Sequence, residues 1–153
     1  VSTGGASVGE LDLLKPAFEA IGGRLNFWKV SMKPGKPFVF GTFQNKLWCG
    51  LPGNPVSAFV TFQLLVRPIL LKLQGARDLS LPVSWGTLME PLSNRGDRRH
   101  FVRVCIDAAG EVRGAGRQSS HILSSLSLAN GLLDLPPESS KNTGDKVSVL
   151  RFR

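Results

Sequence analysis

A rigid loop, Pro52-Gly-Asn-Pro-Val-Ser57, constrains the fold more than any other feature of this chain. It follows residues 47–51, which have the length and apolar side chains of a buried strand, and precedes residues 58–74, which have the pattern of a strongly apolar helix. The two prolines of the loop restrict φ, Gly53 permits backbone angles that other residues avoid, and Pro68 is expected to kink the helix. A strand that leads through such a loop into a helix is typical of α/β layer folds.

The first residues of the chain show the same arrangement. Residues 3–9 form a loop rich in glycine and hydroxyl groups, and residues 10–21 follow with apolar side chains at helical spacing. Gly22-Gly23 ends this helical pattern. The elements expected between it and the rigid loop are a strand over 25–32, a turn over 33–37, a strand over 38–43 and a hairpin tip at 45–46.

The pattern changes near residue 78. Downstream of it, short apolar stretches alternate with turns rich in Gly, Asn, Asp and Pro, and no segment has a long helical period. We therefore expect an α/β unit over 1–77 and a small all-β sandwich or barrel over 78–153. The apolar stretches cover 81–88, 100–107, 111–117, 131–135 and 146–152.

The charge of the chain favours anionic ligands, because 19 Lys and Arg face 11 Asp and Glu, for a net charge of +8. The basic residues are spread over both halves, and the densest cluster, residues 95–103, also contains Asp97. No basic stripe with interleaved aromatic residues is present, so a small anionic ligand in a cleft is favoured over a nucleic acid. No apolar run reaches the roughly 18 residues that span a bilayer, so we expect no membrane partner.

The start of the chain bears on its origin and location. It begins with Val rather than Met, a few residues before a glycine-rich loop, which indicates the downstream part of a longer protein. No signal-peptide pattern opens it, so the expected location is cytoplasmic. Two Cys and two His are too few for a disulfide framework or a zinc finger, and Cys49 is expected in the apolar core.

The first glycine loop is a candidate phosphate site. Gly4, Gly5 and Gly9 let the backbone approach a ligand and expose N–H groups, Ser7 adds a hydroxyl donor, and a helix N-terminus follows. A tight turn that needs glycine for geometry alone explains the same residues equally well. Asp12 also has two possible roles, because a carboxylate at this position suits either a metal ligand or an acid that complements the helix dipole.

A cluster of lysines forms a second candidate. Lys29 and Lys33 end the predicted strand over 25–32 with an even separation, which places both on one face, and Lys36 follows on a Pro-Gly turn. Three ammonium groups repel one another, but they suit a tetrahedral dianion or a phosphate. The alternative is an ordinary solvated turn.

Ser57 lies where the second helix is expected to begin, and taken alone it is an N-terminal helix residue. Together the two loops give two donor-rich segments, each of which enters a helix. If their strands are parallel neighbours, both loops lie at one edge of the sheet, where α/β folds bind ligands.

Six segments of the chain resemble motifs of the MoeA family, the molybdopterin molybdenumtransferases, which include the E domain of gephyrin. The resemblance runs through essentially the whole chain in the order of the family. Its most specific elements are Lys-Pro-Gly-Lys-Pro and Pro-Gly-Asn-Pro-Val-Ser. The segments are Thr3-Gly-Gly-Ala-Ser-Val-Gly-Glu-Leu-Asp12, Phe27-Trp-Lys29, Lys33-Pro-Gly-Lys-Pro37, Leu51-Pro-Gly-Asn-Pro-Val-Ser57, Phe101-Val-Arg103 and Gln118-Ser-Ser-His-Ile-Leu-Ser-Ser125.

The resemblance implies part of a three-layer α/β/α molybdopterin-binding domain, followed by a small barrel-like all-β C-terminal domain. It implies an enzyme that takes adenylylated molybdopterin and molybdate, uses Mg²⁺ to hydrolyse the adenylate, and releases AMP as molybdenum enters the dithiolene. It also implies a homodimer, further acids upstream of residue 1, and possible contact with the molybdopterin adenylyltransferase. A chain of this extent is then expected to be incomplete for activity alone.

The resemblance also implies roles for individual residues. Asp12, Lys29 and Lys33 would be catalytic, with Asp12 as the metal ligand. The substrate-binding residues would be Gly4, Gly5, Ser7, Gly9, Lys36, Pro37, Gly53, Asn54, Pro55, Ser57, Arg103 and Ser120.

Three other functions are compatible with part of the sequence motifs described above. Molybdopterin adenylyltransferases and CinA-type proteins have the Gly-Gly-x-Ser loop, but the β-module after residue 78 and the Pro-Gly-Asn-Pro-Val-Ser loop argue against both. A gephyrin-like scaffold that binds receptor tails belongs to a different class, and no peptide groove can be identified in the sequence.

Overall fold

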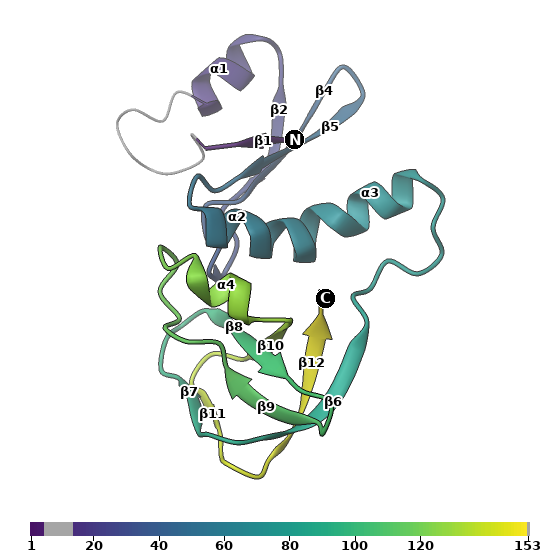
Figure 1. Ribbon diagram of the computed structural model, residues 1–153. Coiled ribbons are helices and arrows are strands. Elements are labelled where there is room, and N and C mark those ends of the chain that lie inside the picture. Colours follow the sequence, from purple (N-terminus) through teal and green to yellow (C-terminus); the bar gives the residue numbers. More distant parts are fainter. Residues whose placement is uncertain (5–13, 153) are drawn as a thin grey trace.

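A computed structural model describes residues 1–4 and 14–152. It shows two stacked units, an α/β unit and a β-barrel, with a long helix between them (Figure 1). The predicted fold class is confirmed: an α/β unit with helices on both faces of its sheet is followed by a small barrel-like all-β unit.

The sheet of the α/β unit has the strand order β1-β5-β4-β2. β1 is parallel to β5, whereas β5, β4 and β2 are antiparallel neighbours. The turn between β4 and β5 is made by Gln44 and Asn45, whose φ angles of 47° and 61° suit a tight two-residue hairpin. The strands are β1 (Ser2–Thr3), β2 (Arg24–Trp28), β4 (Val39–Phe43) and β5 (Lys46–Leu51).

One face of this sheet is covered by α1 (Leu14–Ala20), whose buried Phe18 stacks on Trp48 of β5 with ring centroids 4.2 Å apart. The helical pattern was expected to continue to Ile21, but Ile21 lies outside the helix and its side chain is 60% exposed. The helix ends early because Gly22, two residues after it, adopts a left-handed φ of 87°, and the N–H of Gly23 donates to the carbonyl of Phe18.

The other face is covered by one long helix made of α2 (Pro55–Thr61), a π-helical turn η1 (Phe62–Val66) and α3 (Arg67–Leu73). The predicted start at residue 58 is wrong, because Asn54 caps the helix and Pro55 occupies its first turn. The kink expected at Pro68 takes the form of the π turn just before it, where the N–H of Arg67 bonds to the carbonyl of Phe62.

This helix has enough length and apolar character to cross a bilayer, with a mean hydropathy of 1.6. Many of its apolar side chains pack into two cores. On the sheet side, Val66 packs with Phe38 and Cys49. On the barrel side, Val60 packs with Leu132. The helix is therefore the shared wall of the two units, and Cys49 lies in the core as predicted.

The barrel closes through the strand order β10-β12-β6-β9-β8, with β8 pairing back to β10. Its interior is filled by apolar side chains such as Leu88, Val104 and Leu135. A short ribbon of β7 (Leu92–Asn94) and β11 (Ser139–Lys141), and the helix α4 (Ser124–Leu128), complete the unit. The barrel strands are β6 (Val83–Leu88), β8 (Arg99–Ile106), β9 (Glu111–Gly114), β10 (Gly131–Leu135) and β12 (Lys146–Arg151).

One strand joins the two units. The predicted strand over 25–32 is wrong, because the chain leaves the first sheet after Trp28 and Lys29 has a left-handed φ of 74°. The chain then forms β3 (Met32–Lys33), which pairs in parallel with β8 of the barrel, Met32 opposite Arg99. The carbonyl of Ser31 also accepts a bond from the N–H of Arg99. The backbone path after Trp28 is therefore determined by pairing with β8, a strand of the other unit that is distant in sequence.

Candidate functional site

The structure brings the start of the first glycine loop, Thr3 and Gly4, next to the rigid Pro-Gly-Asn-Pro loop. β1 and β5 are parallel neighbours, with Thr3 opposite Leu51, so both loops leave the same edge of the sheet. The N–H of Gly4 donates to the carbonyl of Leu51 at 3.1 Å, and the hydroxyl of Thr3 donates to the carbonyl of Pro52 at 3.2 Å. A Cβ on Gly53 would lie 3.3 Å from the Cα of Gly4, which shows how closely the two loops approach.

The lysine segment leaves the same edge. β4 begins at Val39, which lies opposite Gly50 near the end of β5 and opposite Trp28 at the end of β2. The segment between β2 and β4 is closed at its base by bonds from the N–H of Lys29 to the carbonyl of Phe38 and from the N–H of Val30 to the carbonyl of Lys36, both 2.9 Å. Three motifs that are distant in sequence therefore converge on one edge of the sheet.

Lys29 and Lys33 do not share one strand face, so that part of the prediction is wrong. Lys29 sits at the positive φ where the first strand ends, whereas Lys33 belongs to β3 and the barrel sheet. Lys36 lies at the base of the segment, directly before the half-buried Pro37, and all three lysines are exposed residues. Gly35, at the turn, packs so closely on α2 that an added Cβ would collide with the side chain of Thr61.

The N-terminus of α2 also faces this edge. The side-chain oxygen of Asn54 accepts bonds from the N–H groups of Val56 at 3.1 Å and Ser57 at 3.2 Å. Asn54 is therefore the N-cap of this helix, a role that the sequence analysis gave to no residue. Pro55 is exposed in the first turn. Ser57 is only 6% exposed and lies inside the helix.

Lys33 lines a basic pocket that sequence reasoning missed. The pocket has a volume of about 270 Å³ and lies between β3 and the start of β8, where Lys33 pairs with His100. Asp97 is the one acid among its lining residues, and its side chain is 93% exposed. The feature of the sequence that could have indicated this pocket is the dense basic cluster at 95–103. The polar lining includes Lys33, Asn94, Arg95, Asp97, Arg98 and His100.

His100 gives this pocket an uncharged polar group. The side chain is 7% exposed, and its Nε2 is buried without a hydrogen-bond partner among the described residues. Burial, aided by the positive charge of Lys33 and of two nearby arginines, lowers the pKa of His100 to about 4. The imidazole is therefore neutral at pH 7, and the positive charge of the pocket comes from the lysine and the arginines.

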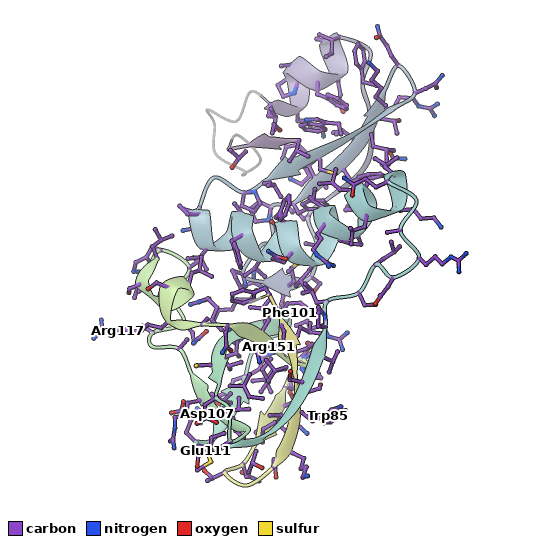
Figure 2. The ribbon with its side chains drawn as sticks, turned by 45° about the vertical axis from the view of Figure 1, so that its right-hand side comes forward. Trp85, Phe101, Asp107, Glu111, Arg117 and Arg151 are labelled. Atoms are coloured by element: carbon purple, nitrogen blue, oxygen red, sulfur yellow. The ribbon has the colours of Figure 1, made fainter. Side chains whose placement is uncertain are left out.

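Arg103, predicted to bind substrate, is fully buried on β8. Its Nε donates to the hydroxyl of Ser125 at 2.7 Å, and its Nη2 donates to the carbonyls of Arg117 at 3.2 Å and Ser119 at 3.3 Å. Ser120 is half-buried in the segment that these bonds hold. α4 and this segment lie next to the N-terminal end of α2 in both views (Figures 1 and 2).

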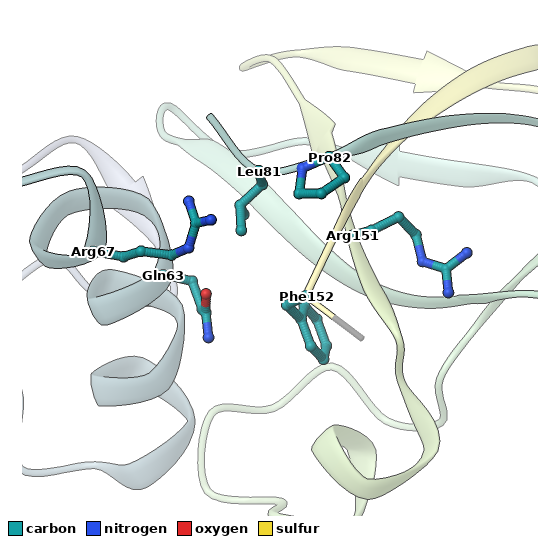
Figure 3. Close-up of a pocket in the computed structure, with 6 residues that line it drawn as sticks. All are labelled: Gln63, Arg67, Leu81, Pro82, Arg151 and Phe152. Atoms are coloured by element: carbon teal, nitrogen blue, oxygen red, sulfur yellow. The ribbon is translucent and has the colours of Figure 1, made fainter. Parts of the chain in front are cut away.

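A larger pocket of about 340 Å³ lies at the junction of the long helix and the barrel (Figure 3). Arg67 extends toward Leu81 there, and its Nη1 donates to the carbonyls of Leu79 and Ser80, both at 3.1 Å. Arg151 points away from Arg67 in the same view. None of the predicted site residues lines this pocket, so it is a feature of the junction between the units.

Four predicted residues, Gly5, Ser7, Gly9 and Asp12, lie outside the described residues. Among residues 1–4 and 14–152, no group of three or more His, Cys, Asp or Glu side chains could hold a metal ion. The described part of the chain therefore does not by itself provide a Mg²⁺ site.

Two known families match separate parts of the chain. Residues 1–72 match the probable molybdopterin binding domain, and residues 86–152 match the MoeA C-terminal region, domain IV. The chain belongs to the MoeA family. The second match favours MoeA over the adenylyltransferase and CinA-type alternatives, because it covers the β-unit that argued against them.

Relatives within and around the MoeA family support the assignment. Molybdopterin molybdenumtransferase of Haemophilus influenzae is 38% identical over 99% of this chain, and the molybdenum cofactor synthesis protein cinnamon of Drosophila melanogaster is 37% identical over 99%. A molybdopterin biosynthesis MoeA protein from Pyrococcus horikoshii has a similar structure, with a TM-score of 0.81 and 27% identity over 99% of this chain. The chain spans 39%, 27% and 36% of these three proteins, respectively.

Proposed function

We propose that this chain is the part of a molybdopterin molybdenumtransferase that binds the phosphate end of adenylylated molybdopterin together with molybdate. The reaction would insert molybdenum into the dithiolene and release AMP, as the family resemblance implies. The observation that carries the proposal is the convergence of Thr3-Gly4 at the start of the glycine loop, the start of α2 and the lysine segment on one sheet edge. Ligands of α/β folds bind at such edges.

The edge of the sheet offers three kinds of group to a phosphate. Gly4 and Gly53 leave room for close approach of the ligand to the backbone. The long helix that starts at Pro55 directs its positive dipole end toward the edge. Because the oxygen of Asn54 is used to cap that helix, its amide NH₂ group is the part of the side chain that can donate to a ligand. Lys29 and Lys36 supply the positive charge.

The pocket beside His100 is the proposed place for the tetrahedral oxyanion. Arg95 and Arg98 offer forked N–H donors, and Lys33 offers a compact positive charge, which together suit a dianion such as molybdate. His100 adds a neutral hydrogen-bonding group whose Nε2 is not used within the described residues. Lys33 stands on the strand that links this pocket to the sheet edge, so the two ligands would be bound at connected places.

Mg²⁺ enters the proposal through the family resemblance, with Asp12 as the one ligand expected from this chain. When bound, a divalent cation stabilises charge on phosphoryl oxygens during hydrolysis of a phosphoanhydride. The described residues contain no cluster for it, and we derive no step through it. The homodimer, the cytoplasmic location and contact with the adenylyltransferase stay predictions.

Titration calorimetry of the chain with sodium molybdate tests the proposal. We expect Lys33→Ala and Arg98→Ala to weaken molybdate binding by about tenfold each, the loss of one charged contact. Arg113→Ala is the matched control, because Arg113 lies on β9 of the same barrel and pairs with Glu111 at 2.7 Å. Binding that is unchanged in both pocket variants, or weakened equally in the control, would contradict the assignment of the pocket.

A further inference from the structure

Arg103 combines complete burial with an uncompensated charge. Its relative exposure is 0%, and no carboxylate among the described residues forms an ion pair with it. Its Nη1 is buried and has no hydrogen-bond partner within the part of the chain that the structure describes. Burial lowers the pKa of the guanidinium. A buried charge without a counter-ion is destabilising in itself, so its position calls for a reason beyond the stability of the barrel.

All the groups that accept hydrogen bonds from the Arg103 side chain lie in one segment, residues 115–125. The planar guanidinium binds two carbonyls, those of Arg117 and Ser119, and the hydroxyl of Ser125. That hydroxyl in turn donates to the carbonyl of Ile122 at 2.7 Å. Three separate points of the segment are therefore tied to one side chain, a geometry that a forked donor can satisfy and an ammonium group cannot.

The backbone of Arg103 holds the same segment. Its N–H donates to the side-chain oxygen of Gln118 at 2.9 Å, and its carbonyl accepts from the amide nitrogen of Gln118 at 3.0 Å. The same carbonyl accepts from the N–H of Ala115 at 2.9 Å. Residues 115–123 contain no helix or strand of their own, so these contacts with Arg103 fix much of their path.

The segment lies on the side of the molecule where the phosphate end of the substrate is proposed to bind. It leads into α4, which sits next to the N-terminal end of α2 in both views (Figures 1 and 2). Ser119 is exposed and Ser120 is half-buried, whereas Arg117 extends outward into solvent. The segment, which contains Ser119 and Ser120, therefore lies on the side of the molecule on which the sheet edge opens.

We infer that Arg103 is a positioning residue, which does not contact the substrate but holds residues 115–125, and with them Ser119 and Ser120, against the ligand site. The identity of the ligand rests on the proposed function, whereas the anchoring of the segment does not. Two independent measurements therefore separate the two ideas.

Limited trypsin digestion of the full chain tests the anchoring. Arg117 is exposed inside the held segment, so cleavage after it reports local opening. We expect Arg103→Met and Arg103→Lys both to accelerate cleavage after Arg117 by about tenfold, with cleavage after Arg77, outside the barrel, as the reference for intact folding. Unchanged cleavage after Arg117 in folded variants would overturn the inference.

Milder variants cover the case in which the Arg103 variants do not fold. Ser125→Ala removes the Nε acceptor, and Gln118→Ala removes the backbone clamp, while both leave the buried guanidinium in place. We expect each to raise cleavage after Arg117 by about threefold, and Ser124→Ala, at the exposed first residue of α4, to have no effect. Equal rates in Ser125→Ala, Gln118→Ala and wild type would again overturn the anchoring.

Calorimetry with sodium pyrophosphate tests the link to the sheet edge, where the phosphate end of the substrate is proposed to bind. A positioning role predicts that Arg103→Lys and Arg103→Met weaken binding to the same extent, because the forked geometry matters and the charge does not. Binding that is retained in Arg103→Lys but lost in Arg103→Met would indicate direct contact with the anion and overturn the positioning role. If the wild-type chain does not bind pyrophosphate, the phosphate site of the proposed function fails, and the digestion alone decides the anchoring.

Discussion

Lys33 pairs directly with His100 where β3 joins β8, so a lysine of the α/β unit becomes part of the wall of a barrel pocket. Neither unit contains the pocket alone. The ligand site proposed here is therefore a property of the way the two units are joined, and several measurable consequences depend on that junction.

The buried His100 should make the chain less stable in mild acid. Its pKa is about 4 in the folded chain against an ordinary value of 6.5, so the unfolded chain binds more protons between these two pH values. The free energy of unfolding should therefore fall as pH falls from 6.5 to 4, by up to ~3 kcal/mol from this group. Urea unfolding of wild type and His100→Gln at pH 7 and pH 4.5 measures the effect. A His100→Gln variant with the full pH dependence would contradict it, and His121→Gln, at an exposed position, is the control.

Gly35→Ala should be strongly destabilising. A Cβ at this position would collide with Thr61 of α2, and the φ of 115° disfavours any side chain. The expected loss of unfolding free energy is about 2–4 kcal/mol. Gly144→Ala is the matched control, because its φ of 91° imposes similar backbone strain with nothing within 4 Å of the added Cβ. Equal losses in the two variants would show that the contact with the helix contributes nothing.

Asn54 should contribute to both stability and binding, and two substitutions separate these roles. Asn54→Ala removes the cap of the long helix and should cost about 1 kcal/mol in urea unfolding. Asn54→Asp should preserve the cap, because a carboxylate accepts the same N–H bonds, but it adds negative charge where a phosphate would bind. We expect pyrophosphate binding to weaken by at least about tenfold in Asn54→Asp. An Asp variant that binds pyrophosphate like wild type would place the phosphate elsewhere.

Lys36 should matter for the reaction of the complete protein. It lies at the base of the segment that leaves the sheet edge, where the carbonyl of Lys36 is fixed by the N–H of Val30. In the full-length polypeptide we expect Lys36→Ala to reduce molybdate-dependent cofactor formation by at least about tenfold. Lys46→Ala is the control, since Lys46 is an exposed lysine at the opposite end of β5. Unchanged formation in Lys36→Ala would remove Lys36 from the site.

The sequence was sufficient for features that depend on local patterns. The strand, rigid loop and helix around Pro52–Ser57 were predicted because proline, glycine and apolar periodicity act within a few residues. The start of the helix was placed too late, although Asn54 followed by Pro55 is a capping signal that favours the earlier start. That error came from the reading of the sequence rather than from a lack of information in it.

Other features depend on partners that are distant in the chain. The end of β2 at Trp28 and the pairing of β3 with β8 involve contacts across more than 60 residues, and the apolar pattern over 25–32 gave no sign of a break. Arg103 alternates with the buried Val102 and Val104, which favours an outward face, but the segment over 115–125 covers that face. The basic pocket was missed for the same reason, because its walls come from both units.

The pairing of β3 with β8 also limits how this protein can be divided. A fragment that starts near residue 78 would keep every strand of the closed barrel but lose Met32 and Lys33 from the end of β8. It would expose the unpaired backbone of that strand beside the apolar surface of Leu132, a combination that favours aggregation. Cutting the chain between its two family matches should therefore yield aggregation-prone fragments rather than two independently folding domains.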